Sequence, residues 1–132
     1  MTVLVGYLPT VEGEAAFAAA LDEAVRRAEP LLLINSPRSG APVSADAAAP
    51  AELATLTKRA SEAGVALEIR QPSHTGELSE ALLAAADEAD ASVIVIGLRR
   101  RSPVGKLFLG SAAQQILLNA TRPVLAVKPA HH

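Results

Sequence analysis

The chain has 132 residues, half of them apolar, a net charge of −2 at pH 7 and no cysteine. This length suits one domain, which we expect to span residues 1–130 with a short tail at 131–132. The nearly neutral charge disfavours a general role in binding nucleic acid or an anionic membrane surface, and the lack of cysteine excludes disulfides and thiolate chemistry. No apolar run approaches the roughly 18 residues of a membrane span, and no secretion signal is recognisable. We therefore expect a cytoplasmic protein with no membrane partner.

The first half of the chain alternates between predicted strands and predicted helices. An apolar run at residues 3–8 predicts the first strand, and an apolar stripe at helical spacing over 17–25 predicts the first helix. Two glutamates just before that stripe suit the positive end of a helix dipole. The run at 30–35 predicts the second strand. A second stripe over 53–63 predicts a helix that ends at Gly64, a residue type that commonly terminates helices.

The second half continues the same alternation. Strands are predicted at 65–70, 92–97 and 123–128, and helices at 78–89 and 113–120. The strand at 65–70 alternates between apolar and polar residues, which is typical of an edge strand. The other four strands are nearly continuous in Val, Leu and Ile, which indicates that both of their faces are buried.

This alternation predicts an α/β fold, a five-stranded parallel sheet that is doubly wound with right-handed crossovers. If the first strand lies beside the fourth, the strand order is 3-2-1-4-5. Such sheets bind ligands beyond the carboxyl ends of the strands, where the strand order reverses. The long connection at 36–50 is more typical of a surface loop than of a site. The connection at 98–109 exceeds the roughly 2–6 residues usual between a strand and its helix, so we expect function there.

Phosphate binding is the first hypothesis for the segment 97–114, GLRRRSPVGKLFLGSAAQ. A phosphate site needs converging backbone N–H groups, glycines that let the anion approach, and a helix N-terminus behind them. Gly97 ends the fourth predicted strand, and Gly110 and Ser111 open the last predicted helix. The spacing does not match a P-loop, and no G-x-G-x-x-G follows the first strand.

The tail VIVIGLRRRSPVGKLFLGSAAQQILLNATRPVLAV closely resembles the universal stress protein family. ATP-binding members of that family carry the motif G-x2-G-x9-G-[ST] at this place. Gly97, Gly110 and Ser111 match the motif, whereas Arg100 replaces its second glycine. The resemblance therefore implies a nucleotide site with a degenerate motif. Its phosphate end is expected to comprise Gly97, Arg99, Arg100, Gly110, Ser111 and Ala112.

The basic residues of this segment have two interpretations. At Arg100, the side chain either narrows the ligand space and strains a left-handed backbone, or contacts phosphate oxygens through its guanidinium group. Arg99, Arg101 and Lys106 are expected to face solvent, where they raise the anion concentration near the helix terminus.

The same resemblance implies that the rest of the nucleotide lies at the loops after the first two strands. Adenine is expected beside Asn35 and Ser36, and the ribose beside Leu8, Pro9 and Thr10. ATP-binding relatives usually have an aspartate at the position of Leu8. Losing such a charged hydrogen bond costs about 1.5–3 kcal/mol, or roughly tenfold to a hundredfold in affinity. Asn35 could equally cap its strand, and for Thr10 capping of the first helix is favoured over a ribose contact.

Two functions follow from these patterns. The first is a stress-response protein that binds ATP or another adenine nucleotide, with Mg²⁺ as a candidate cofactor. The second is a family member that has lost nucleotide binding and acts as a dimeric protein-interaction module.

We expect a homodimer through the last strand, Pro123 to Val127, because an edge strand presents unpaired backbone groups. Catalysis beyond slow ATP hydrolysis is not expected, because His74 stands in a loop without a catalytic motif.

Overall fold

The computed structural model describes residues 1–36, 48–72, 77–100, 107–108 and 110–129. Within this part, five parallel strands form the main sheet, in the order β3-β2-β1-β4-β7. They are β1 (Thr2–Gly6), β2 (Leu31–Ile34), β3 (Leu67–Arg70), β4 (Ala91–Gly97) and β7 (Val124–Val127). The predicted strand order is confirmed, with β7 as the fifth strand of the sheet and β3 at an edge as expected.

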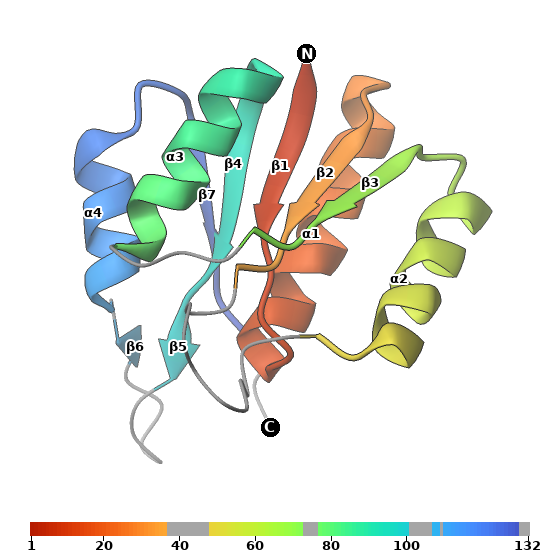
Figure 1. Ribbon diagram of the computed structural model, residues 1–132, viewed down its shortest axis with the longest axis horizontal. Coiled ribbons are helices and arrows are strands. Elements are labelled where there is room, and N and C mark those ends of the chain that lie inside the picture. Colours follow the sequence, from red (N-terminus) through yellow and green to blue (C-terminus); the bar gives the residue numbers. More distant parts are fainter. Residues whose placement is uncertain (37–47, 73–76, 101–106, 109, 130–132) are drawn as a thin grey trace.

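Helices cover both faces of this sheet. They are α1 (Val11–Arg27), α2 (Pro50–Glu62), α3 (Leu78–Ala89) and α4 (Ser111–Asn119). Figure 1 shows α3 and α4 on one face, with α1 and α2 on the other. The core is divided in the same way. One apolar cluster contains Phe17 of α1 and Leu56 of α2, and the other contains Leu82 of α3 and Ile116 of α4.

Local sequence signals explain where the helices begin and end. The side chain of Thr10 caps α1, because its Oγ1 accepts a hydrogen bond of 3.1 Å from the backbone N–H of Gly13. Pro50 opens α2, where the N–H that proline lacks would have no helical partner. Gly64 follows α2 with a φ of 76°, a left-handed conformation that glycine adopts without a Cβ clash. The predicted cap at Thr10 and the predicted stop at Gly64 are both confirmed.

The segment after β4 differs from the prediction of a continuous loop over 98–109. Residues Arg99–Arg100 (β5) and Leu107–Phe108 (β6) form a short antiparallel pair. A two-residue strand is too short for a periodic pattern, so hydrophobic alternation could not reveal it. The pairing also gives Arg100 a strand conformation, which removes the left-handed backbone strain considered at that position.

Several sequence expectations fall outside the described residues. They concern the surface loop within 37–47, His74, the orientation of Arg101 and Lys106, the side chains of Arg99 and Arg100, and the tail at 131–132.

Candidate functional site

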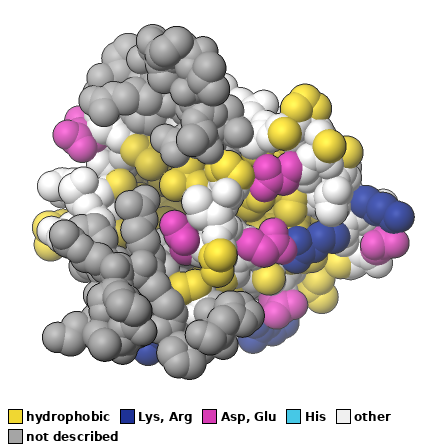
Figure 2. Space-filling view, turned by 90° about the horizontal axis from the view of Figure 1, so that it is seen from below, with side chains coloured by type: hydrophobic (Ala, Val, Ile, Leu, Met, Phe, Trp, Pro, Cys, Tyr) yellow, Lys and Arg dark blue, Asp and Glu magenta, His cyan; other side chains and the backbone are white. Residues whose placement is uncertain are grey.

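A cavity of about 420 Å³ opens where the carboxyl ends of β1, β2 and β4 meet the first turn of α4. It lies where the strand order reverses between β1 and β4, the position expected for a ligand in a doubly wound sheet. Figure 2 looks onto this edge of the molecule and shows hydrophobic side chains with acidic side chains beside them. The cavity therefore combines apolar surface with a few polar groups.

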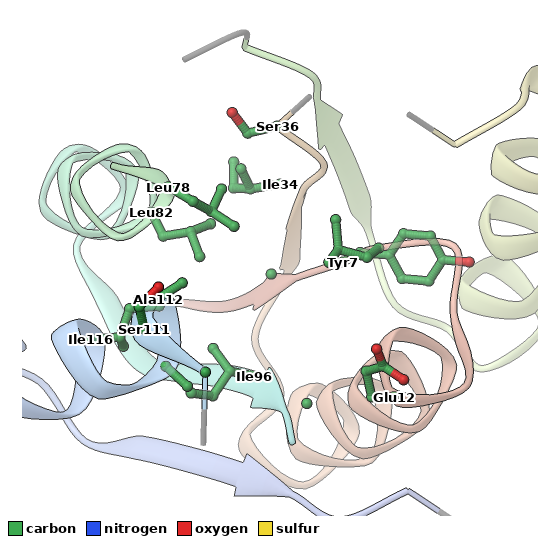
Figure 3. Close-up of a pocket in the computed structure, with 15 residues that line it drawn as sticks. Tyr7, Glu12, Ile34, Ser36, Leu78, Leu82, Ile96, Ser111, Ala112 and Ile116 are labelled. Atoms are coloured by element: carbon green, nitrogen blue, oxygen red, sulfur yellow. The ribbon is translucent and has the colours of Figure 1, made fainter. Parts of the chain in front are cut away.

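The inner wall of the cavity is apolar. Figure 3 shows Ile34 of β2, Ile96 of β4 and Ile116 of α4 around the cavity, with Leu78 and Leu82 of α3 closing it from above. Burying an apolar or flat aromatic group against such a wall yields about 25 cal/mol for each Å² removed from water. This part of the cavity is suited to a ligand group such as a heterocyclic base.

The other end of the cavity is formed by the N-terminus of α4. Gly110 is the N-cap, with φ −64° and ψ 166°, and no side-chain cap of this helix is seen among the described residues. Ser111 and Ala112 follow it and also line the cavity. The first N–H groups of a helix lack intrahelical partners and carry the positive end of its dipole. This end of the cavity is therefore suited to an anion.

Two glycines bring the start of α1 against the ends of the neighbouring strands. A Cβ at Gly97 would lie 2.2 Å from the carbonyl oxygen of Glu12, and a Cβ at Gly13 would lie 1.8 Å from the carbonyl oxygen of Leu8. Real Cβ atoms do not approach oxygen so closely, so any other residue forces the backbone apart. Gly97 thus lines the cavity and also permits the close packing of β4 on α1.

Glu12 lines the cavity from the first turn of α1. From the sequence alone, this residue has no role beyond a favourable position at the helix dipole. Its place in the wall depends on the close packing of α1 against Gly97, which no local pattern reveals. A site contact by Glu12 was therefore not foreseen.

The three predicted residues after β1 face different hollows. Leu8 lines the cavity, whereas Pro9 and Thr10 line a second, more open hollow of about 590 Å³ together with Glu52 of α2. The hydroxyl of Thr10 is already engaged in capping α1. The structure therefore brings Leu8 to the cavity and places Pro9 and Thr10 on the far side of the loop.

Asn35 is fully buried and ties three loops together. Its Nδ2 donates to the carbonyl oxygen of Tyr7 at 3.0 Å, while its Oδ1 accepts from the backbone N–H of Ala48 and from Nε2 of Gln71, each at 2.9 Å. These bonds favour the strand-end interpretation of its side chain. Ser36 is buried as well, and it lines the cavity while its hydroxyl donates to a backbone carbonyl in the loop after β3.

Tyr7 borders both hollows. Its ring points away from the cavity toward α2, where the hydroxyl donates to Glu52 (Figure 3). Phe17 meets this ring edge to face, with the ring centroids 6.5 Å apart. Burial, together with the hydrogen bond to Glu52, raises the pKa of Tyr7 well above its ordinary value. The phenol therefore stays protonated and remains a donor that links β1 to α2.

In the described part of the chain, no group of three or more His, Cys, Asp or Glu side chains is placed to hold a metal ion. Among the helices of the same part, none combines the length and the apolar character needed to cross a membrane.

Comparison with known proteins identifies the family. The model of the universal stress protein family matches residues 1–128. A universal stress protein from Mycolicibacterium smegmatis is 45% identical over 127 residues, which cover 96% of this chain and 97% of the relative. The chain belongs to the universal stress protein family.

Solved structures share the fold over almost the whole chain. A universal stress protein from Archaeoglobus fulgidus is 31% identical with a TM-score of 0.80, and the match covers 97% of this chain and 98% of that one. The universal stress protein from Archaeoglobus fulgidus in complex with dAMP is 25% identical with a TM-score of 0.74, over the same shares of the two chains. The second of these similar proteins thus holds an adenine nucleotide.

Proposed function

We propose that this protein binds an adenine nucleotide, ATP in the cell, in the cavity between β1, β4 and α4. One observation carries the proposal: a single cavity joins an apolar wall to a helix N-terminus that no described side chain caps. A nucleotide carries an aromatic base and an anionic group in one molecule, so it complements both ends. The dAMP complex of a similar universal stress protein supports the choice of adenine.

The base is proposed to lie on the apolar wall, between Ile34 and Ile96 and near Ser36. A cavity of about 420 Å³ falls within the roughly 300–1,000 Å³ typical of small-molecule sites. The lining residues therefore fit an adenine base in both size and polarity. Asn35 contributes by holding the loops that frame this part of the cavity.

The phosphates are proposed to meet Gly110, Ser111 and Ala112 at the start of α4. Glycine as N-cap leaves the helix N–H groups open to an anion, which would be stabilised by the helix dipole. Arg99 and Arg100 stand in β5, between β4 and α4 in the chain. Arg100 is proposed to contact the outer phosphates, and Arg99 to raise the anion concentration near them. Mg²⁺ is proposed to enter with the nucleotide, because phosphate oxygens and water supply most of its ligands in such sites.

A calorimetric titration with ATP and Mg²⁺ tests this proposal. The protein is first denatured and examined by mass spectrometry, so that nucleotide retained during purification is detected. We expect micromolar binding, or release of bound adenine nucleotide. No heat at millimolar ATP and no released nucleotide would contradict the proposal.

A second candidate function is protein interaction through a homodimer, and β7 is the observation that favours it. This strand forms one edge of the sheet, and its Leu125 is 38% exposed. We propose that Pro123 to Val127 pairs with a second copy, which would satisfy backbone groups that an edge strand leaves open. A protein of this kind could act as an interaction module without nucleotide.

The oligomeric state tests the second candidate. Leu125→Asp should convert dimers to monomers in sedimentation, because it places a charge in the proposed interface. Val25→Asp is the control for an added charge, since Val25 is 51% exposed on α1 and lies outside the segment Pro123 to Val127. Dimers that persist in Leu125→Asp would contradict an interface at this edge.

For either function we propose a single domain over residues 1–130 that acts in the cytoplasm, where adenine nucleotides are abundant.

A further inference from the structure

The cavity wall contains a carboxylate that phosphate binding does not use. Glu12 lines the cavity together with apolar residues and the start of α4. We propose that Glu12 accepts hydrogen bonds from the ribose hydroxyls of the ligand, and that it makes the site selective for ribonucleotides. The inference rests on the proposed function and deepens it, because it names the sugar that the site prefers.

The side chain of Glu12 lies beside the middle of the cavity. Its Cβ lies 3.1 Å from the point that a Cβ on Gly97 would occupy, so the side chain starts directly at the end of β4. Figure 3 shows Glu12 on one side of Ile96, with Ser111 and Ala112 on the other. A ligand whose base lies on the apolar wall and whose phosphate meets α4 has its sugar near Ile96 and Gly97. Glu12 is the one acidic residue among the described residues that line the cavity.

The chemistry of a carboxylate fits vicinal hydroxyls. An ionised carboxylate only accepts hydrogen bonds and offers about four lone-pair sites. Glu12 can therefore keep its interactions within the protein and still accept from two ribose hydroxyls. Leu8, which also lines the cavity, has no acceptor in its side chain. Repulsion between Glu12 and phosphate further favours the orientation in which the phosphate lies at α4.

The interaction with the helix dipole does not by itself explain why a glutamate stands at position 12. Glu14 stands in the same first turn of α1 and supplies the same charge to the dipole, but it forms an ion pair with Arg59 and lines the second hollow. The two glutamates thus share one electrostatic role at the helix start. They differ in that Glu12 borders the cavity, which makes Glu14 a matched control.

Calorimetry with two ligands tests the inference. AMP and 2′,3′-dideoxyAMP are titrated into the parent protein, Glu12→Gln and Glu14→Gln, and each variant is checked by thermal denaturation. We expect the parent and Glu14→Gln to bind AMP about tenfold more tightly than the dideoxy analogue, as for a hydrogen bond to a charged acceptor. Glu12→Gln should lose most of this preference while binding the analogue as the parent does.

The other outcomes separate the two proposals. If Glu12→Gln keeps the full preference for AMP, or weakens both ligands equally, nucleotide binding stands and the role of Glu12 is overturned. If the parent binds neither these ligands nor ATP at millimolar concentration, the proposed function fails, and the inference fails with it.

Discussion

The two sides of the cavity rim differ in whether their polar groups have hydrogen-bond partners within the protein. On the side of β1 and β2, polar groups are paired within the protein: Ser36 donates to a backbone carbonyl in the loop after β3, and Asn35 bonds to three separate loops. On the side of α4, the N-cap is Gly110, the first turn contains no acidic residue, and no side chain in the described part of the chain caps it. A helix start that the protein itself leaves uncapped beside a cavity is where an anionic ligand gains most.

The glycines around the cavity also differ in role, since some are required for packing and one leaves space for a ligand. Gly97 and Gly13 are required because backbone atoms occupy the space of a side chain, whereas Gly110 has an extended backbone that other residues could adopt.

Gly97→Ala should have the largest effect. The new Cβ would meet the carbonyl oxygen of Glu12 at 2.2 Å, so β4 and α1 must separate. We expect a loss of about 3 kcal/mol in the free energy of unfolding, at the upper end of overpacking costs. Chemical denaturation measures it. Gly64→Ala is the control, because open space surrounds Gly64 and its cost of about 1–2 kcal/mol comes from the left-handed backbone alone. Equal losses in the two variants would contradict the packing role of Gly97.

Asn35→Ala should be the next most destabilising change. It leaves the carbonyl of Tyr7 and the N–H of Ala48 without their Asn35 partners in a buried setting, which costs about 2 kcal/mol. Urea denaturation would show the loss as a lower midpoint. Gln71→Ala removes only the exposed partner of Asn35 and should stay within about 0.5 kcal/mol of the parent. A loss of similar size in both variants would argue against Asn35 as the link between the loops.

Thr10→Ala should cost about 1 kcal/mol, the usual value for the loss of an N-cap side chain. Thr10→Ser keeps the hydroxyl and should retain most of the stability. Thermal unfolding distinguishes the two variants. A Thr10→Ala protein as stable as the parent would show that α1 gains little from this cap.

Gly110→Asp should change stability least and binding most. A carboxylate at the N-cap of α4 adds a few tenths of a kcal/mol relative to glycine. The same carboxylate would occupy the N–H groups and repel phosphate, so ATP affinity should fall at least about tenfold. Parallel calorimetry and thermal unfolding measure both effects. A more stable protein with unchanged ATP affinity would place the phosphate elsewhere.

The fold followed from the sequence because each of its signals is local. Continuous Val, Leu and Ile runs mark the buried strands β1, β2 and β4, and the stop at Gly64 and the cap at Thr10 depend on neighbouring residues alone. The same kind of run wrongly predicts burial on both faces for β7, which lies at the sheet edge and is only partly buried, because the place of a strand in the sheet is not a local property. The position of the cavity also followed, because the strand order fixes where the sheet reverses.

The wall of the cavity was less predictable. Leu78 and Leu82 belong to a helical stripe that indicates only burial, and Glu12 reaches the cavity because α1 packs closely on Gly97. The pair β5–β6 was missed because two residues carry no periodic pattern. In each case the missing information is a contact between distant segments, which neither spacing nor composition contains.

The most direct test of the account follows the backbone amides of α4 by ¹⁵N-resolved NMR during titration with ATP. If the start of α4 holds the phosphate, the amide signals of Ser111 and Ala112 should move in a saturable way. The amide of Gly64, which follows α2 and lines neither hollow, should move much less. Unchanged Ser111 and Ala112 signals at millimolar ATP would contradict the claim that this helix start is left open for an anion.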